Sequence, residues 1–383
     1  MHILVTSPIP SHPQNHGNRA RVMALCKALQ LAGAQIHFVY GGLERLTAEQ
    51  EQEMRAEWDF VYVLPPMRAK DRRQSFASHH AIDDWYADAL DDVVKKILGT
   101  WRVHYCIANY VWFSRWLPQV PAGIPTLIDT HDIFADRHAR LKADGLAPSW
   151  FSTTQEEESV ALNRANTVIA IQEAEALEFQ TRTKANVVTL GHFIEPTFLS
   201  PRALGENQKV TIGYLASDNP INQQSLEALV SGLSKRPHLV EKFEFVLAGA
   251  ICNGPAAQSE LFKKLGFVKD ATDFYRDVDV IINPNVGGTG LKIKSIEAMA
   301  FGKPLVATRD SMIGIQTDAA YHAFRRPDDM LAFFDERFSA EQLGEMAHTS
   351  QHIITDYMAT QQKMLAALFP ALSHSADPEP GDG

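Results

Sequence analysis

Short apolar runs alternate along this chain with segments of helical periodicity. The run HILVT at residues 2–6 leads through a polar loop into a segment where apolar residues from Val22 to Leu29 recur at helical spacing. Gly33 ends that helix, and IHFVY at residues 36–40 is typical of a second strand. The pattern predicts a strand, a loop, a helix and a strand in succession.

The same alternation continues through the first half of the chain. Further strands are predicted at residues 60–64, 105–109, 126–130, 167–171 and 186–190. Runs this uniformly apolar, with helices between several of them, are typical of parallel strands that are covered on both faces. The first half is therefore predicted to be a doubly wound α/β sheet.

A second series of alternating elements begins near residue 210. Strands are predicted at residues 210–215, 243–249, 278–284 and 304–308, and helices at 223–233 and about 290–301. Residues 193–208 contain prolines, a glycine and little periodicity, so they are predicted to be a linker between the two series.

These boundaries define a predicted domain organisation. It consists of a Rossmann-like domain at residues 1–192, a linker at 193–208, a second Rossmann-like domain at 209–354, a helix at 355–372 and a disordered tail at 373–383. Whether that helix returns to the first domain is left open. Open α/β sheets bind ligands at the carboxyl ends of their strands, so two such domains facing each other would form a ligand cleft.

Composition narrows the class of protein. The 383 residues carry a formal net charge of −10, which disfavours a protein that coats nucleic acid or anionic lipid. Cys26, Cys106 and Cys252 are far apart and lack metal-ligand spacing, which favours reduced thiols. No apolar stretch reaches the ~18 residues of a membrane span, and the first residues lack a basic region typical of a signal peptide. We expect a cytoplasmic protein.

The segment NPNVGGTGLKIKSIEAMAFGKPLVAT at residues 283–308 carries the strongest chemical signal. A predicted strand ends in a loop with Gly287, Gly288 and Gly290, which opens into a predicted helix. Backbone N–H groups and the helix dipole would converge there, and this geometry binds phosphate. Lys292 and Lys294 could add positive charge. The alternative is a glycine turn with solvated lysines and a helix ion pair between Lys294 and Glu297.

The same segment resembles the retaining glycosyltransferases of family 4, which have the GT-B fold. The family's E-A-M-A-x-G-x-P-V-V-A stretch is matched by residues 297–307, and the similarity extends upstream to residues 266–284, to LAGA at 247–250 and to IGYL at 212–215. The resemblance implies two doubly wound Rossmann-like domains facing across a cleft. It also implies a glycosyltransferase (EC 2.4) that uses a nucleotide diphosphate sugar.

Site residues in the second domain follow from the resemblance. Glu297 would bind the ribose hydroxyls, and the backbone of Gly288, Thr289, Gly290 and Leu291 would hold the diphosphate and the sugar. The chain departs from the family in two ways. Thr289 stands where the family has the first glutamate of its signature, and the family's Arg and Lys that clamp the diphosphate fall near Tyr214 and Asn222. We therefore hypothesise that Lys294 supplies the missing cation.

The loop after the first strand is a second candidate for donor binding. Gly17 and Asn18 would let a helix N-terminus approach a ligand, and Arg19 adds a fixed positive charge. The alternative is a capped helix with a surface arginine. The resemblance favours donor binding, because family members place a glycine-containing loop here against the donor phosphates and the acceptor.

His131 and Asp132 follow the apolar run at residues 126–130 and would lie at the carboxyl end of the sheet. A histidine beside an aspartate is more often a satisfied loop residue than a catalyst. The resemblance favours catalysis, because the family's strand-ending histidine points at the reacting sugar. We predict His131 and Asp132 as catalytic residues.

Two further features bear on the partners. A basic cluster at residues 68–73, with Phe76, Trp85 and Tyr86 nearby, could contact a lipid-linked acceptor at the inner face of a membrane, or could be a solvated loop. No HExxH motif is present, and we expect neither a metal ion nor another cofactor. The acceptor would be a glycan, a lipid-linked sugar or a small molecule.

The predicted activity is transfer of a sugar from a nucleotide diphosphate sugar to an acceptor hydroxyl with retention, in polysaccharide or glycoconjugate synthesis. A GT-B-fold epimerase or phosphorylase would use the same phosphate cradle, and a catalytically degenerate nucleotide-sugar-binding protein would keep it without turnover. A nicotinamide dehydrogenase is disfavoured, because the loop after the first strand lacks GxGxxG.

Overall fold

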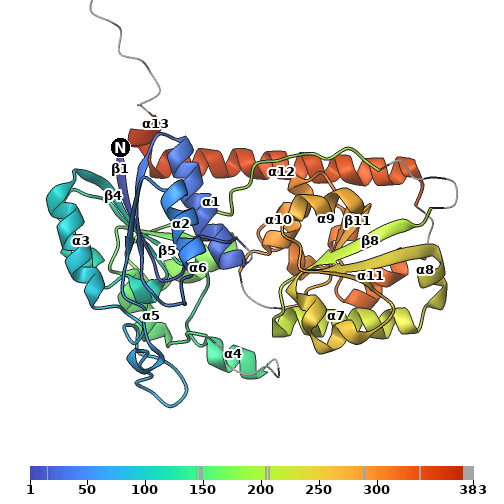
Figure 1. The fold of residues 1–383 in the computed structure, drawn as a ribbon, viewed down its shortest axis with the longest axis horizontal. Coiled ribbons are helices and arrows are strands. Elements are labelled where there is room, and N and C mark those ends of the chain that lie inside the picture. Colours follow the sequence, from blue (N-terminus) through green and yellow to red (C-terminus); the bar gives the residue numbers. More distant parts are fainter. Residues whose placement is uncertain are drawn as a thin grey trace, which may run out of the picture. The chain divides into compact units, whose positions relative to one another are not determined.

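The computed structural model describes residues 1–14, 16–143, 145, 150–202, 205, 208–287, 290–335 and 338–373. These residues form two compact units (Figure 1). Unit 1 comprises Met1–Phe193 together with the chain from Gln361 onward, and unit 2 comprises Ile194–Thr360.

Unit 1 is built on a seven-stranded parallel sheet with the order β3-β2-β1-β4-β5-β6-β7. Its strands are β1 (His2–Ser7), β2 (Gln35–Tyr40), β3 (Phe60–Val63), β4 (Val103–Asn109), β5 (Thr126–Asp129), β6 (Thr167–Ala170) and β7 (Asn186–Thr189). The strand order reverses direction between β1 and β4. Because parallel crossovers are right-handed, this reversal puts the connecting helices on opposite faces, and ligand sites form at such a reversal.

The helices of unit 1 lie between its strands in the chain. They are α1 (Gly17–Leu31), α2 (Ala48–Glu57), α3 (Ala89–Thr100), α4 (Arg137–Ala143), α5 (Gln155–Leu162) and α6 (Glu173–Gln180). Helix α1 buries Val22, Leu25, Cys26 and Leu29, the residues whose helical spacing predicted it. Burying each such large apolar side chain contributes about 1.5–3 kcal/mol.

Unit 2 is built on a five-stranded parallel sheet with the order β10-β9-β8-β11-β12. Its strands are β8 (Val210–Leu215), β9 (Phe243–Ala248), β10 (Lys263–Gly266), β11 (Val280–Asn283) and β12 (Leu305–Ala307). Its helices are α7 (Pro220–Ser234), α8 (Pro237–Lys242), α9 (Ala271–Asp277), α10 (Ile293–Ala300), α11 (Pro327–Phe333) and the first part of α12 (Ala340–Leu368). Ile212, Leu247 and Ile282 from neighbouring strands meet in its core.

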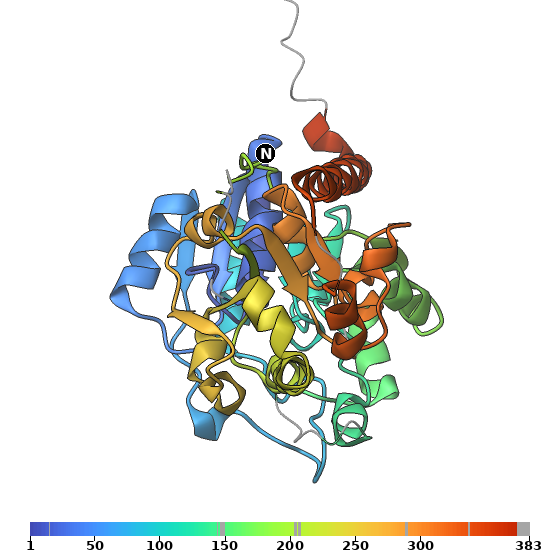
Figure 2. The same cartoon turned by 90° about the vertical axis from the view of Figure 1, so that its right-hand side faces the viewer.

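The chain returns to unit 1 at Gln361, within α12. Figure 1 shows α12 from the side and Figure 2 shows it along its axis, as one unbroken helix (red). The backbone N–H of Gly191 donates to Oε1 of Gln361 at 2.6 Å, and the rings of Tyr105 and Phe369 lie 5.0 Å apart. The helix expected at 355–372 therefore begins earlier, at Ala340, and is followed by α13 (Pro370–Ser373).

The fold class predicted from the sequence is confirmed, and each predicted strand overlaps an observed one. Strand β10 was not predicted, because its sequence KKLG is mostly exposed at the sheet edge and has no apolar run. The predicted tail lies outside the described residues apart from Ser373, which belongs to α13. Among the described helices, none combines the length and the apolar content that crossing a membrane requires.

Candidate functional site

A buried polar cluster in unit 2 surrounds the side chain of Lys294 on α10. Its Nζ lies 2.7 Å from Oδ1 of Asn222 and 3.3 Å from Oδ1 of Asn285, and it sits 5.1 Å from the ring centroid of Tyr214. The three partners come from the end of β8, the first turn of α7 and the loop after β11. This is the carboxyl edge of the sheet, where parallel α/β domains bind ligands.

The partners of Lys294 are also bonded to one another. The hydroxyl of Tyr214 donates to Oδ1 of Asn285 at 2.9 Å, and Nδ2 of Asn285 donates to Oδ1 of Asn222 at 2.9 Å. Asn219 caps α7 by accepting the backbone N–H of Asn222 at 2.9 Å, which fixes Asn222 in the first turn. The ammonium group is thus held by neutral oxygen atoms on a rigid frame.

No described carboxylate forms an ion pair with Lys294. Burial, and to a smaller extent the nearby charge of Lys292, lower its pKa from the usual value to about 7. A cation that is desolvated and uncompensated gains strongly from an anion placed beside it. The cluster is therefore suited to bind a phosphate group.

Glu297 lies one turn after Lys294 on α10 and is half-buried. The hydroxyl of Tyr275 donates to its Oε2 at 3.1 Å, and the Tyr275 ring stacks on Phe301 with centroids 4.4 Å apart. Burial raises the pKa of Glu297 to about 7, and the Tyr275 hydrogen bond opposes that rise. The alternative of a helix ion pair with Lys294 is not realised: the carboxylate bonds Tyr275, and the ammonium bonds Asn222.

The glycine-rich loop before α10 differs from the prediction in one respect. Helix α10 begins at Ile293, with Lys292 as its N-cap, so Gly290 is not at the helix N-terminus. Gly290 adopts a left-handed φ of 77°, and the Nζ of Lys292 donates back to its carbonyl at 3.0 Å. Helix α10 therefore begins three residues later than predicted.

Two other loop positions bear on phosphate binding. The backbone N–H of Gly287 donates to Oδ2 of Asp310 at 2.8 Å, so a carboxylate of the protein already occupies this donor. Leu291 is buried. Gly288 and Thr289, predicted to contact the donor, lie outside the described residues.

The glycine of the E-A-M-A-x-G stretch has a structural explanation. Gly302 ends α10 in the left-handed conformation with φ 69°, donating its N–H to Met299, while Lys303 donates to the carbonyl of Ala298. These two hydrogen bonds form a helix C-cap, which favours glycine. The glycine therefore positions α10, and the chemistry of the stretch rests on Lys294 and Glu297.

A second cluster lies at the carboxyl ends of β1, β4 and β5 in unit 1, around His131. Its Nε2 lies 2.9 Å from Oδ1 of Asn109, and Nδ2 of Asn109 donates to the carbonyl of Thr6 at 3.0 Å. The Thr6 carbonyl only accepts, so it fixes the Asn109 amide with its oxygen toward His131. Nε2 must therefore carry the proton, and Nδ1 is left with its lone pair as an acceptor.

The imidazole of His131 is held in a fixed plane. It stacks on the ring of Tyr110 with centroids 4.1 Å apart and an interplanar angle of 11°. Both residues have left-handed backbones, with φ 65° at His131 and 70° at Tyr110. Such conformations cost on the order of 1–3 kcal/mol each and occur most often at functional sites. Burial lowers the pKa of His131 to about 4, so the ring is neutral at pH 7.

A buried ion pair lies beneath this histidine. Nε and Nη2 of Arg21 donate to the two oxygens of Asp129 at 3.0 and 2.9 Å, and Arg21 also bonds the carbonyls of Leu190 and Gly191. Both side chains are inaccessible to solvent. Burial raises the pKa of Asp129, but the charge and hydrogen bonds of Arg21 together with the nearby His131 and His192 outweigh that effect and hold the pKa below its usual value.

The sequence analysis did not identify this pair. An arginine within the otherwise apolar face of α1 and an aspartate within the run TLIDT were the available signals. Oδ2 of Asp129 lies 3.5 Å from Nε2 of His131, so the carboxylate of Asp129 places its negative charge on the protonated side of the ring.

The predicted residues at the start of α1 have partners within unit 1. Helix α1 starts at Gly17 with His16 as its N-cap, so Asn18 is not the cap residue. Oδ1 of Asn18 accepts the backbone N–H of Arg19 at 2.9 Å, and its side chain bonds the Tyr110 hydroxyl. Arg19 pairs with Glu44 at 2.5 Å. Asn18 therefore joins the His131 cluster through Tyr110.

Asp132 is tied into its own loop. Its Oδ1 accepts the backbone N–H of Ile133 at 2.9 Å, and its Oδ2 pairs with Arg137 at 2.5 Å. Both oxygens are occupied, which favours a role in shaping the loop after β5. His131 is the better candidate for contact with a substrate.

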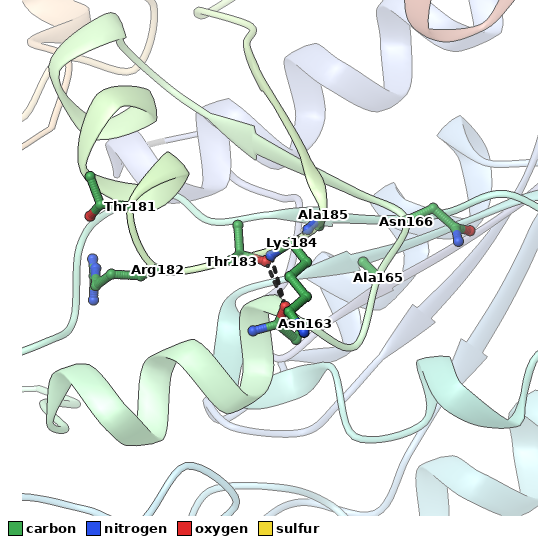
Figure 3. Close-up of a pocket in the computed structure, with 8 residues that line it drawn as sticks. All are labelled: Asn163, Ala165, Asn166, Thr181, Arg182, Thr183, Lys184 and Ala185. Atoms are coloured by element: carbon green, nitrogen blue, oxygen red, sulfur yellow. Dashed lines mark hydrogen bonds between the residues drawn. The ribbon is translucent and has the colours of Figure 1, made fainter.

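The cavity of about 810 Å³ drawn in Figure 3 is unrelated to these clusters. It is lined by residues that directly precede β6 and β7, so it lies at the amino ends of the strands. Its polar groups already bond one another: Thr183 Oγ1 and the Lys184 N–H donate to Oδ1 of Asn163, as the dashed lines show.

Comparison with known proteins identifies the class of protein to which this fold belongs. No curated protein sequence matches the chain. HepE from Anabaena, solved with UDP and glucose, shares 14% identity over 97% of this chain and 100% of its own, with a TM-score of 0.64. Sucrose-phosphate synthase from Thermosynechococcus elongatus shares 12% identity over 98% and 100% of the two chains, with a TM-score of 0.64.

TarM from S. aureus, solved as a variant in complex with fondaparinux, alpha-GlcNAc-glycerol and UDP, is also similar. It shares 10% identity over 97% of this chain and 99% of its own, with a TM-score of 0.65. These likenesses establish the GT-B fold. Residues 209–332, which contain Lys294 and Glu297, match the family model described as glycosyl transferases group 1. The chain is therefore a GT-B-fold glycosyltransferase with a glycosyl transferases group 1 domain.

Proposed function

We propose that this glycosyltransferase moves a sugar from a nucleotide diphosphate sugar to an acceptor hydroxyl with retention of anomeric configuration. The observation that carries the proposal is the desolvated ammonium of Lys294, which no described carboxylate pairs. HepE and TarM, which share the fold, were both solved with UDP, which supports a nucleotide diphosphate as the donor's leaving group.

Lys294 is assigned to the diphosphate. Its Nζ lies against Tyr214 and Asn222, and the clamping Arg and Lys of the resembling family fall near these two residues in the sequence. The ammonium thus extends from α10 to the end of β8 and the first turn of α7, where we expect the family's clamping side chains to start. As the bond from the anomeric carbon to the diphosphate breaks, its electron pair moves to the leaving oxygen. A fixed ammonium beside that oxygen stabilises the developing charge.

Glu297 is assigned to the ribose. A carboxylate accepts hydrogen bonds from two neighbouring hydroxyls, and one oxygen of Glu297 already accepts from Tyr275, which fixes its orientation. Donating hydroxyls favour the ionised carboxylate. They would therefore lower the raised pKa of this group when the donor binds.

His131 is assigned to the transferred sugar. Its neutral Nδ1 can accept a hydrogen bond from a sugar hydroxyl and hold the ring for attack at the anomeric carbon. We propose that the leaving diphosphate itself takes the proton of the incoming acceptor hydroxyl. This step needs no protein nucleophile, and the proposal assigns charge neutralisation to Lys294 without a metal ion.

The location of the activity is a further part of the proposal. The three cysteines are free thiols, which suits a reducing compartment. We infer that the protein acts in the cytoplasm, where it would meet soluble nucleotide sugars.

Differential scanning fluorimetry with UDP, GDP, ADP and CDP tests the proposal most broadly. A ligand that binds only the native state raises the melting temperature with the logarithm of its concentration. We expect at least one nucleoside diphosphate to do so, and its sugar conjugate to be consumed only when an acceptor is present. Epimerised or phosphorolysed sugar without acceptor would instead favour an epimerase or a phosphorylase, and no binding by any nucleotide would contradict the proposal.

A further inference from the structure

Unit 1 contains a hollow of about 760 Å³ just beyond the carboxyl end of β3. Its lining combines an apolar floor with a cationic rim. Leu64 and Tyr86 are buried and Met67 is half-buried, whereas Arg68, Lys70 and Arg73 are exposed. A volume of this size is within the range that proteins use for small ligands.

One wall of the hollow is held by the end of β2. Gly42 has φ 76°, and a Cβ added there would lie 2.5 Å from the carbonyl oxygen of Pro65. The backbone N–H of Met67 donates to the carbonyl of Gly42 at 2.7 Å. Only glycine allows this approach, so the segment from Pro65 to Met67 is fixed across the strand end.

The loop that follows Arg73, a residue of the lining, is held by Asp84. Its carboxylate accepts the N–H and the hydroxyl of Ser75 at 2.8 and 2.6 Å, and the N–H of Ala81 at 2.9 Å. The backbone N–H of Arg73 donates to the Asp84 carbonyl at 3.2 Å. A buried carboxylate thus organises the loop that carries the cations, and the hollow is pre-formed.

The acidic groups at the hollow are already neutralised. Asp71 pairs with Arg68 at 2.9 Å, and Asp88 pairs with Arg115 at 2.7 Å. Lys70 and Arg73 form no ion pair with any described residue. In a protein whose net charge is −10, two exposed cations that form no ion pair with any described residue mark a site that favours an anion.

The hollow adjoins the His131 cluster through the turn after β2. Arg72 donates to the carbonyl of Leu43, and Arg19 pairs with Glu44. The loop beside the hollow and the start of α1 therefore contact neighbouring residues of this turn. Arg19 follows Asn18, which bonds the Tyr110 hydroxyl beneath His131. The hollow and His131 therefore lie on the same carboxyl edge of the sheet.

We propose that this hollow is the acceptor subsite and that the acceptor is a saccharide bearing a carboxylate or a phosphate. The inference rests on the proposed glycosyl transfer. The acid group would lie between Lys70 and Arg73, and the C–H face of a sugar would pack on the floor of Leu64, Met67 and Tyr86. An anionic membrane surface is the competing occupant. A hollow of about 760 Å³ favours a saccharide, because a membrane contact would use a protruding apolar surface.

Saturation-transfer NMR titrations of the intact protein test the subsite without any donor. The probes are methyl β-glucuronide, glucose 6-phosphate and neutral methyl β-glucoside. We expect one of the two anionic probes to bind about tenfold more tightly than the glucoside, with the carboxylate and phosphate arms identifying the acid group. Equal binding of the neutral and anionic probes, or binding of phosphatidylserine vesicles without either anionic sugar, would overturn the proposal.

The matched variants are the double substitutions Lys70→Ala with Arg73→Ala, and Lys95→Ala with Arg102→Ala. The second removes two exposed cations elsewhere in unit 1. We expect only the first to abolish the preference for the anionic probe, and equal loss in both would refute the subsite. UDP titrations run in parallel separate the two claims. UDP binding without sugar-acid binding refutes the subsite alone, and sugar-acid binding without nucleotide binding refutes the proposed transfer alone.

Discussion

The Nζ of Lys294 lies 2.7 Å from Oδ1 of Asn222, although 72 residues separate them in the chain. Asn222 is a neutral residue near a position where the sequence resemblance predicts a cation. The structure thus pairs the loss of charge on α7 with a cation on α10. The ammonium and the amide meet at the carboxyl edge of the unit 2 sheet.

The first prediction concerns the pH dependence of nucleotide diphosphate binding. Burial lowers the pKa of Lys294 to about 7 in the free protein, and a bound diphosphate would raise it. Below pH 7 the ammonium is already formed and contributes no pH dependence. Above pH 7 binding requires proton uptake, so affinity should fall by up to about tenfold per pH unit.

Isothermal titration calorimetry in buffers of different ionisation enthalpy checks this directly. At pH 8 wild type should take up close to one proton per UDP bound through this group, and Lys294→Met should take up fewer. Identical proton uptake by the two proteins would show that Lys294 does not meet the diphosphate.

The second prediction separates stability from function at Glu297. Burial raises its folded-state pKa to about 7, above the unfolded value of 4.5. The stability that this group contributes is therefore present below pH 4.5 and is lost as the pH rises through 7. Glu297→Gln keeps an oxygen for Tyr275 and avoids the buried charge. We expect it to raise stability by about 1 kcal/mol at pH 8, roughly 2–4 °C in melting temperature.

The same variant should bind the donor more weakly, because an amide is a poorer acceptor for ribose hydroxyls than a carboxylate. Thermal melts at pH 4.5 and pH 8, with and without UDP, measure both effects. A variant that is destabilised at pH 8, or that binds UDP as tightly as wild type, would contradict these assignments.

The third prediction concerns the tautomer of His131. The chain from the Thr6 carbonyl through Asn109 places the proton on Nε2. Asn109→Asp puts a carboxylate beside that proton and should raise the pKa of His131 from about 4 toward neutrality. Protonation of Nδ1 would remove the acceptor, so activity should acquire an acidic limb that wild type lacks near pH 6.

Nitrogen-15 NMR of labelled histidine reports the tautomer and the protonation state directly. Asn109→Ser is the matched control, because it shortens the side chain without adding charge. If wild type carries its proton on Nδ1, or if both variants show the same pH profile, the role assigned to Asn109 is wrong.

The fourth prediction concerns the buried pair of Arg21 and Asp129. Removing one partner leaves an uncompensated charge in the core, so Arg21→Met or Asp129→Leu should each cost about 3–5 kcal/mol of unfolding free energy. The double variant removes both charges and should cost clearly less than the sum. Urea denaturation of the three variants measures the coupling, and additive losses would show that the pair contributes no mutual stabilisation.

Much of this architecture could be predicted from local sequence. Buried parallel strands are continuous apolar runs. Lys294 and Glu297 lie on consecutive turns of α10, so their spacing in the sequence already predicts that they are neighbours. The edge strand β10 escaped because exposed strands lack that apolar signal. The start of α10 at Ile293 was also missed, because the left-handed turn at Gly290 and the contact of Lys292 with its carbonyl appear only in the folded loop.

The partners of the site residues could not be predicted, because the folded structure and not a local sequence pattern brings them together. Arg19 has the sequence context of a free cation, and only the fold brings Glu44 to it. Asp132 likewise has the context of a catalytic acid until Arg137 and Ile133 occupy both its oxygens. Arg21 is 108 residues from Asp129, so no local pattern could reveal the buried pair.

Titration calorimetry of UDP into Lys294→Met tests the central claim most directly, with Lys269→Met, an exposed lysine of unit 2, as the matched control. Charged hydrogen bonds contribute about 1.5–3 kcal/mol. We therefore expect the dissociation constant to rise about 10- to 100-fold in Lys294→Met and to stay unchanged in Lys269→Met. An unchanged dissociation constant in Lys294→Met would contradict the account.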